Sequence, residues 1–378
     1  MARNENPPLV EPVTDRAGEG DATAETDVVL ELDGVTREFG REAAVDSLSL
    51  TVRDGELLTL LGPSGCGKTT TLRLIEGLDR PTAGSISIAG ETVADERTFR
   101  KPEDRDVGLV FQDFALFPHL TVEENVAFGL REWDDAERES RVDELLDLVG
   151  LQAHREKMPS QLSGGQRQRV ALARSLAPEP DVLLLDEPFS NLDVRLRVEM
   201  REEVRRILKA AGVTTVSVTH DQEEALSISD RVAIMNDGRI EQVGKPEVVF
   251  ENPESRFVAS FLGRASFLPG RVRGAVVETP LGTLSTDQLN GPVEAYDGAK
   301  IDVLVRPDDL EARHAEDGSA DGRIVHRQYT GPAFVYRVAL EGGGVLRCLH
   351  NHVETFEHDQ PVAVDIVADH PLAWYPTT

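Results

Sequence analysis

The chain has 378 residues, 40% of them hydrophobic and 29% charged, so it is long enough for two or three packed domains. Its 68 acidic and 40 basic residues give a formal net charge of −28, which argues against a nucleic-acid partner. No apolar run reaches the roughly 18–20 residues of a membrane helix. The first residues are acidic and contain Pro, unlike a signal peptide. We therefore expect a cytosolic chain that works at a membrane only through partner subunits.

The basic residues and the cysteines carry two further indications. Only six of the 40 bases are Lys, and this scarcity combined with the acid excess resembles proteins of salt-loving archaea, where salt screens the self-repulsion. The two cysteines, Cys66 and Cys348, are too few for a disulfide framework and fit a reducing compartment.

Along the chain, the first ordered elements are expected to be strands. Residues 1–26 are polar, acidic and rich in Pro and Gly, which predicts a disordered tail. Strands are predicted next at Val28–Leu32, Leu48–Val52 and Leu57–Leu61, the first two in a small antiparallel sheet. The third run is apolar except for Thr59, as in a strand that could be buried on both faces. The helix that follows its glycine-rich loop is predicted to bury Leu72, Ile75 and Leu78.

A helical region is predicted from about Thr121 to Leu176. Thr121 and Glu124 form a capping box at its start, and Gly150 ends its second helix. The apolar face of that second helix comprises Val142, Leu145, Leu146 and Val149.

The strand pattern then returns at Asp181–Leu185 and Thr215–Val218. Between these strands a helix is predicted to begin near Asp193 and to bury Val204, Ile207 and Leu208. Alternating strands and helices indicate a parallel sheet covered on both faces.

The pattern changes after about Leu262. Short alternating segments at Ile301–Val305, Phe334–Leu340 and Val362–Val367 predict a small all-β domain of OB-like barrel type. The predicted fold class is therefore α/β for residues 27–262, with an antiparallel β subdomain and a helical subdomain at about 100–178. An all-β domain follows at 263–378.

The segment Gly62–Thr69 matches the phosphate-loop pattern G-x-x-x-x-G-K-[ST] between a predicted strand and a predicted helix. Its glycines let backbone N–H groups surround phosphate oxygens, and the helix directs its positive end toward them. We expect Lys68 to reach the β- and γ-phosphates and Thr69 to bind Mg²⁺. The predicted ATP-binding residues here are Gly62, Pro63, Ser64, Gly65, Cys66, Gly67, Lys68, Thr69 and Thr70.

Two carboxylates, Asp186 and Glu187, follow the apolar run 182–185 at the expected carboxyl edge of the sheet. Asp186 is predicted to hold Mg²⁺, and Glu187 to orient or deprotonate the attacking water. The alternative is an acid pair that only caps a helix.

A second candidate anion site is the run Ser163, Gly164, Gly165 and Gln166, which precedes the helix predicted at Arg167–Leu176. One ATP needs only one phosphate cradle, so this second cradle is expected to serve another nucleotide or another subunit. The alternative is a simple helix cap.

These motifs, together with His220 after the strand 215–218, resemble in content and order the ATPase subunits of ABC transporters, over about Val28 to Leu262. The resemblance implies a head-to-tail homodimer in which Ser163, Gly164, Gly165 and Gln166 of one copy close on the γ-phosphate held by the other. It implies ATP hydrolysis with Mg²⁺ and with Lys68, Gln112, Glu187 and His220 as catalytic residues.

The same resemblance assigns roles to single residues. Gln112 matches the Gln that contacts Mg²⁺ and water, and His220 the switch histidine at the γ-phosphate. Phe39 occupies the position of an aromatic that stacks on adenine, although that residue is more often Tyr. The loop across the dimer interface corresponds to Ser190, Asn191, Leu192 and Asp193. A core histidine and a core aromatic are the alternatives for His220 and Phe39.

The C-terminal part resembles the β regulatory domain of importer ATPases for spermidine, sulfate, sugars and ferric iron. The matching segments are Ser260–Pro269, Arg306–Leu310 and His370–Trp374, and the last is most similar to the ferric-iron branch. We therefore expect ferric iron as cargo, with polyamine, thiamine, sulfate or sugar as alternatives.

Such an ATPase would lie on the cytoplasmic face of the membrane and act through integral-membrane permease subunits and, indirectly, an extracellular solute-binding protein. The stretch Asp113–Val122, with Phe114, Leu116, Phe117 and Pro118, is expected to form a groove for a permease helix. Its aromatics are expected to be exposed, which would suit such docking, and core packing is the alternative.

Three other interpretations are open from the sequence. Cys348, His350 and His352 alternate on one predicted strand and would suit a metal, although polar surface is the more frequent explanation. A soluble ABC ATPase acting on nucleic acid or ribosomes is disfavoured by the acidic charge, the single phosphate loop and the lack of a coiled-coil insertion. An exporter subunit would not be expected to carry the β domain.

Overall fold

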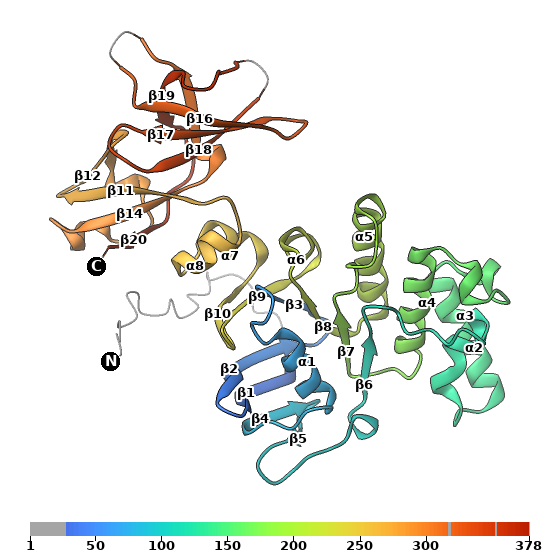
Figure 1. The fold of residues 1–378 in the computed structure, drawn as a ribbon. Helices are drawn as coiled ribbons and strands as arrows, with labels where there is room; N and C mark the ends of the chain where they lie inside the picture. The colour runs from blue at the N-terminus through green and yellow to red at the C-terminus, as the bar shows by residue number, and fades with distance from the viewer. Residues whose placement is uncertain (1–27, 317–318, 352–353, 378) are drawn as a thin grey trace.

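The computed structural model describes residues 28–316, 319–351 and 354–377. An α/β part leads through α7 (Pro246–Glu251) and α8 (Arg256–Phe261) into an all-β part at the C-terminus (Figure 1). The tail predicted at 1–26 lies outside the described residues. Within the described ranges, no helix combines the length and the apolar character that crossing a bilayer requires.

The central sheet has six strands in the order β10-β9-β3-β8-β7-β6, all parallel except for the β9–β10 pair. Every residue of β3 and β8 is buried, as expected for strands covered on both faces. Neighbouring residues of β7 therefore belong to different cores. Leu183 packs against the helical region, and Leu184 packs against the antiparallel sheet of the ATPase part, described next. The bounds are β3 (Leu57–Leu61), β6 (Val107–Val110), β7 (Val182–Asp186), β8 (Thr214–Thr219), β9 (Arg231–Asn236) and β10 (Arg239–Gly244).

The predicted antiparallel sheet is present and has four strands in the order β2-β1-β4-β5. It packs with α1 (Lys68–Glu76) in the core that also receives one face of the central sheet. The prediction that α1 buries Leu78 was wrong. The helix ends at Gly77, which has a φ of 90°, and Leu78 lies beyond it and is 50% exposed. The strands are β1 (Val28–Phe39), β2 (Glu42–Arg53), β4 (Ala83–Ile88) and β5 (Glu91–Ala94).

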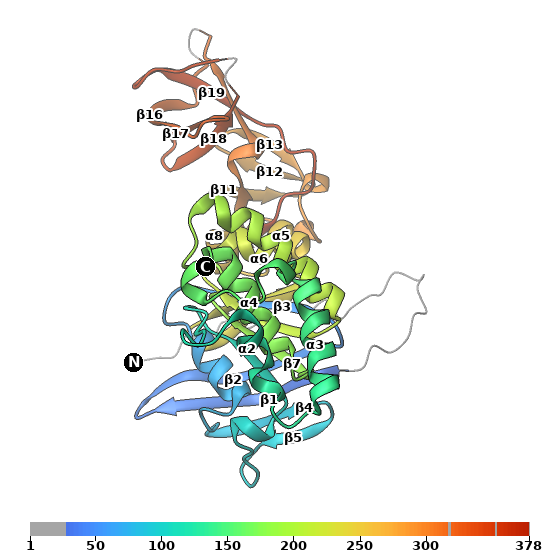
Figure 2. The same ribbon diagram turned by 90° about the vertical axis from the view of Figure 1, so that its right-hand side faces the viewer.

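The helical region lies beside the central sheet, at the end remote from β1 and β2 (Figures 1 and 2). The capping box of Thr121 and Glu124 is confirmed, and the predicted apolar face of α3 is buried. Helix α4 begins at Gly164, three residues earlier than predicted. The helices are α2 (Val122–Val126), α3 (Asp135–Leu148) and α4 (Gly164–Leu176), followed after β7 by α5 (Val194–Ala211) and α6 (Gln222–Ile228). Helix α5 begins next to Asp193, as predicted, and the Asp193 side chain caps it.

The C-terminal part is all-β, as predicted, and forms two five-stranded sheets over one apolar core. The first sheet has the order β13-β12-β11-β14-β20, with β11 (Ser266–Arg273), β12 (Val276–Thr279), β13 (Gly282–Ser285), β14 (Lys300–Val305) and β20 (Trp374–Pro376). The second has the order β15-β19-β16-β17-β18, with β15 (Leu310–His314), β16 (Gly322–Tyr329), β17 (Phe334–Leu340), β18 (Val345–His350) and β19 (Pro361–Ile366). Short 3₁₀ turns lie at Pro102–Asp104, Ala127–Leu130, Gln152–His154, Pro159–Gln161, Thr286–Gln288, Val293–Tyr296 and Pro307–Asp309.

Cys348 and His350 point into this β core, so the expectation of exposed polar surface was wrong. Burial raises the pKa of the Cys348 thiol to about 12. The Ala312 backbone N–H donates to His350 Nε2 at 2.9 Å, and burial lowers the pKa of His350. His352 lies outside the described residues, and the described ranges contain no cluster of three or more His, Cys, Asp or Glu suited to a metal. Both described side chains are thus part of the packing.

Candidate active site

The glycine-rich loop between β3 and α1 has a path that larger residues could not follow. Gly67 has a φ of 106°, and a Cβ atom on it would lie 2.2 Å from the Ala44 carbonyl oxygen. A Cβ on Gly62 would lie 2.3 Å from the Met235 carbonyl oxygen. Packing against β2 and β9 therefore fixes this loop at the N-terminus of α1, where the helix dipole favours an anion.

Lys68 is a buried cation at the start of α1, with 7% of its surface exposed. Its Nζ donates to the carbonyl oxygens of Gly62 at 2.7 Å and Pro63 at 3.0 Å. Among the described residues, no acidic side chain forms an ion pair with it. A buried ammonium that has only neutral acceptors is well suited to bind a phosphate oxygen.

Asp186 and Glu187 lie at the carboxyl end of β7. Burial, and then the neighbouring Glu187, raises the pKa of Asp186. Burial also raises the pKa of Glu76, and Asp186 adds to that shift. Asp186 forms no ion pair with a cation among the described residues, as expected of a carboxylate that binds a divalent cation.

The residues around this edge fit Mg²⁺ in the type of their donors. Thr69, Gln112 and Asp186 offer a hydroxyl, an amide and a carboxylate oxygen, and Mg²⁺ prefers oxygen ligands. Mg²⁺ is usually held by one or two carboxylates together with substrate phosphates, so a site with a single ligating acid is sufficient.

The structure brings Glu187 and His220 together. Glu187 follows β7 and His220 follows β8, and these parallel neighbours end at the same edge of the sheet. Glu187 Oε1 lies 3.0 Å from His220 Nδ1, within hydrogen-bond distance. The Glu187 backbone has a φ of 45° and donates its N–H to the Val218 carbonyl, also at 3.0 Å. The carboxylate is thus held on a backbone turn beside a histidine that is more than half exposed.

The Ser163 segment caps a helix and also leaves an anion-binding terminus open. The Gln166 N–H donates to Ser163 Oγ at 3.3 Å, and the Ser163 N–H donates to Gln166 Oε1 at 2.9 Å. A Cβ on Gly165 would lie 2.8 Å from Met200 Sδ, so that glycine packs closely on α5. Helix α4 stands well apart from α1 in Figure 1, so one chain does not bring the two cradles together.

The predicted dimer loop is hydrogen-bonded to the segments that follow β7 and β6. Ser190 Oγ donates to the Glu187 carbonyl at 2.9 Å, and Asn191 Nδ2 donates to the Gln112 carbonyl at 2.8 Å. Leu192 is 6% exposed and packs into the helical core. The structure therefore connects Gln112, the dimer loop and Glu187 directly.

Phe39, predicted to stack on adenine, is the last residue of β1 and is 52% exposed. The Arg37 guanidinium carbon lies 4.5 Å from the centroid of its ring. One ring face is therefore occupied by a cation, which leaves the other for a second flat group.

The predicted docking segment differs from expectation. Phe114 has a φ of 64° and is 6% exposed, because Arg174 of α4 donates to the carbonyls of Phe114 and Ala115 and holds this turn inward. The expectation that Phe114 is exposed was therefore wrong. Leu116 and Phe117 are half-buried, and only Pro118 of the predicted set is exposed.

Two polar connections near the site were not predicted. Gln168 is buried in α4, and its Nε2 donates to the Pro188 carbonyl at 3.1 Å. Arg197 of α5 donates to Asp221 at 3.2 Å and to the Leu192 carbonyl at 3.3 Å. Arg197 and Arg201 both form ion pairs with Asp221. Their i,i+4 spacing, which places them on one face of α5, was the one feature of the sequence that could have indicated a shared acidic partner.

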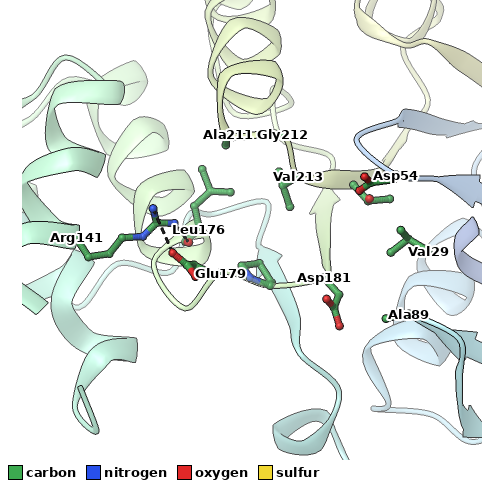
Figure 3. A pocket seen from close by; sticks show the side chains of 12 residues that line it. Val29, Asp54, Ala89, Arg141, Leu176, Glu179, Asp181, Ala211, Gly212 and Val213 are labelled. Carbon is green, nitrogen blue, oxygen red and sulfur yellow. Dashed lines mark hydrogen bonds and ion pairs between the residues drawn. The ribbon is translucent and has the colours of Figure 1, made fainter. Parts of the chain in front are cut away.

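A separate cavity of about 350 Å³ lies near Asp181, which precedes β7, whereas Glu187 follows that strand (Figure 3). In it Arg141 forms an ion pair with Glu179 at 3.6 Å, and partial burial raises the pKa of Asp181. Because the two ends of β7 lie at opposite edges of the sheet, this cavity is not the nucleotide site.

Comparison with known proteins shows which family the chain belongs to. Residues 45–190 match the ABC transporter family model, and residues 303–374 match the TOBE domain model. The chain is 45% identical over 335 residues to a spermidine/putrescine import ATP-binding protein of Nitratidesulfovibrio vulgaris, covering 85% of this chain and 89% of the relative. The chain belongs to the ATP-binding subunits of ABC transporters. It is an ATPase of the importer type with a C-terminal TOBE domain.

Other relatives of this ABC ATPase carry other cargo names. A sulfate/thiosulfate import ATP-binding protein of Chromobacterium violaceum is 51% identical over 74% of this chain and 75% of its own length. An Fe(3+) ions import ATP-binding protein of Rhizobium etli is 44% identical over 82% of this chain and 87% of its own length. Among solved structures, cbiO1 of Clostridium perfringens, part of the cbiONQ ABC transporter complex, matches 60% of this chain and 92% of its own at 30% identity and a TM-score of 0.56.

Proposed function

We propose that two copies of this chain close head to tail around two Mg-ATP molecules and thereby energise solute uptake through separate membrane subunits. The observation that carries this proposal is the separation, within one chain, of helix α1, which begins at Lys68, from helix α4, which Ser163 caps (Figure 1). Lys68 has no acidic partner among the described residues. The helix terminus at Ser163 is capped by Gln166 and does not contact the nucleotide loop of its own chain. A second copy supplies the missing half of each site.

In this proposal each residue acts on charge that develops during hydrolysis. Lys68 binds the β- and γ-phosphate oxygens, and Phe39 stacks on adenine with the ring face that Arg37 leaves free. Glu187 orients the attacking water, and His220 holds the Glu187 carboxylate and reaches the γ-phosphate. Thr69, Asp186 and Gln112 would hold Mg²⁺, which would neutralise charge on the phosphates. Loss of the γ-phosphate removes the contact with Ser163 of the other copy, so the dimer opens.

The role of Glu187 is tested by Glu187→Gln, which preserves size and removes the negative charge. We expect ATP turnover to fall about 10²–10⁴-fold, the usual range for a positioned general base, while ATP binding persists. Glu202→Gln on the exposed side of α5 is the matched control and should hydrolyse ATP normally. Normal turnover by Glu187→Gln would refute the assignment.

For the cargo, we propose ferric iron as the first solute to test. The support is the resemblance of the segment 370–374 to the ferric-iron branch, together with the Rhizobium etli relative. In the structure this segment packs within the chain: Trp374 Nε1 donates to the Asn290 carbonyl, and His370 pairs with Asp309. It therefore serves as a family marker and not as a cargo contact. Polyamine and sulfate or thiosulfate are the alternatives that relatives of similar identity carry in their names.

The cargo is tested in proteoliposomes that contain the chain and its cognate permease, with the solute-binding protein added outside. Ferric iron should stimulate ATPase activity, whereas spermidine, thiosulfate and thiamine should not. Stimulation by one of the other solutes alone would replace iron. Co-purification with ribosomes or DNA instead of integral-membrane subunits would favour the soluble class of ABC ATPase.

We also propose that the chain is attached peripherally to the cytoplasmic face of the membrane and that its domain boundary falls near Leu262 and Gly263. The support for the boundary is that α8 ends at Phe261 and β11 begins at Ser266. For the position, the support is the import function in the relatives' names.

A further inference from the structure

A cavity of about 390 Å³ lies where the end of α8 meets the outer face of the second β sheet. This volume is in the range of small-molecule sites. Its walls combine apolar and cationic groups from both parts of the chain: Phe250, Gly263, Arg264, Arg306, Pro307, Asp308, Thr330, Val335 and Leu349.

Arg306 is the unusual residue of this cavity because it is a buried cation without an anion. Its side chain is 7% exposed, and no acidic side chain among the described residues forms an ion pair with it. Nη2 donates to the Phe250 carbonyl at 2.7 Å, whereas Nη1 has no hydrogen-bond partner within the described ranges. Arginine is almost never buried to this degree unless it is paired. The Phe250 ring, 3.8 Å from the guanidinium carbon, compensates only part of the lost hydration.

The charge of Arg306 is not neutralised by its nearest acids. Burial lowers the pKa of its guanidinium, and the charges of Asp308 and Asp309 oppose that shift without forming an ion pair with it. Asp309 accepts from the Arg306 backbone N–H at 2.7 Å and from the His370 ring at 3.1 Å, so its carboxylate is already engaged. Among the lining residues, Asp308 is the single acid against two arginines.

The sheet face beside the cavity is also basic. The register of β17 and β18 places Val335 opposite Leu349 and, one pair further along the same face, Arg337 opposite Arg347. Like charges directly opposite each other in a sheet are unfavourable. Neither arginine forms an ion pair with a described acid, although the chain carries an excess of 28 negative charges. This face is therefore electropositive on an acidic protein.

We propose that the cavity binds a small organic anion, whose acidic group pairs with Arg306 and whose carbon body lies against Val335 and Leu349. Guanidinium groups bind carboxylates and phosphates through paired, charge-assisted hydrogen bonds. The apolar walls favour an anion with a carbon skeleton over a bare inorganic oxyanion. Because Arg306 also donates to the Phe250 carbonyl at the end of α7, the bound anion joins the TOBE domain to the ATPase domain.

The proposal is tested by calorimetric titration of the full-length chain at constant ionic strength. The probes are citrate and glutarate, with sulfate and phosphate as inorganic arms. A Lys68→Ala background prevents the nucleotide loop from contributing anion binding. We expect one saturable site for an organic probe and about tenfold weaker binding in Arg306→Gln, as for the loss of a charge-assisted hydrogen bond.

Leu349→Asp provides a variant that does not depend on a buried residue, because Leu349 is 43% exposed. The added carboxylate faces the cavity and should weaken binding of the organic probe by a similar factor. Val345→Asp, on the same strand and face but outside the cavity lining, is the matched control and should bind nearly as the parent does.

Three results would overturn the proposal. They are the absence of a saturable site for both organic probes, equal affinity for sulfate or phosphate, and unchanged affinity in Arg306→Gln and Leu349→Asp. A lower melting temperature of Arg306→Gln without any change in binding would show that Arg306 only braces the two domains.

Discussion

Arg105 is expected to hold the helix that carries the phosphate loop. It is 2% exposed and donates from Nη1 to the carbonyls of Leu74 at 2.7 Å and Ile75 at 2.8 Å, in the last turn of α1. Its Nε donates to the Arg100 carbonyl at 2.8 Å. A cation at a helix C-terminus also interacts favourably with the helix dipole. We predict that Arg105→Met destabilises the ATPase domain and weakens ATP binding.

The magnitude follows from two opposing contributions. Hydrogen bonds to a charged group contribute about 1.5–3 kcal/mol each, and Arg105 makes three. Burial opposes them, since it lowers the pKa of the guanidinium to about 10 and Nη2 has no partner among the described residues. That shift corresponds to a cost of roughly 3 kcal/mol, so we expect a net loss of about 3 kcal/mol on substitution. For a domain of this size the melting temperature should fall by about 6–12 °C.

The assay is differential scanning calorimetry of the full-length chain, with the ATPase transition assigned by its shift on addition of ATP. Arg100→Met is the control: its side chain pairs with Glu91 on the surface, so the loss should stay below about 1 kcal/mol. An unchanged melting temperature in Arg105→Met would refute the reasoning, because buried charged hydrogen bonds would then contribute nothing to α1.

Three further predictions rest on single contacts. Gly67→Ala should abolish measurable ATP binding because its Cβ would clash with the Ala44 carbonyl, whereas Gly65→Ala, with open space around it, should weaken binding only through backbone strain; equilibrium titration with a fluorescent ATP analogue distinguishes them. Burial raises the pKa of Glu224 from 4.5 to about 8, so the free energy of unfolding should decline as the pH rises between these values. In urea titrations Glu224→Gln should show a flatter decline over that window. A decline parallel to that of the wild type would contradict the assignment of the decline to Glu224. Cys348 should resist iodoacetamide at pH 8 in the native state and react after denaturation, because its thiol pKa is about 12; fast native labelling, seen by mass spectrometry, would exclude the buried position.

The strands and helices with strong local patterns were predictable from the sequence. The mainly apolar runs of β3 and β7 indicated a doubly covered parallel sheet, and Thr121 and Asp193 marked helix starts. The shape of the phosphate loop was predictable for the same reason, because it depends on local residues. Its glycines allow the tight backbone path, and Lys68 donates to two carbonyl oxygens of the same loop. Glu187 and His220 were each predicted at the end of a strand, whereas their contact with each other was not predicted and follows from the common edge at which parallel strands end.

What the sequence did not predict depends on contacts between distant segments. Phe114 was predicted to be exposed, yet Arg174, 60 residues away, holds its carbonyl and turns the ring inward. Cys348 and His350 alternate as surface residues do, but the second sheet places them toward the core. Arg306 looked like part of a family segment, and its lack of an anionic partner appears only when α7 and the β sheet are brought together. Local periodicity carries none of this information.

The central claim is that each ATP is bound by residues of two copies of the chain. The most direct measurement is the mass of Glu187→Gln in solution, by light scattering, with magnesium and either ATP or ADP. We predict a dimer with ATP, a monomer with ADP, and a monomer under both conditions when Ser163→Arg is added to block the second cradle. A wild-type chain that hydrolyses ATP at full rate while it and Glu187→Gln stay strictly monomeric would contradict the claim.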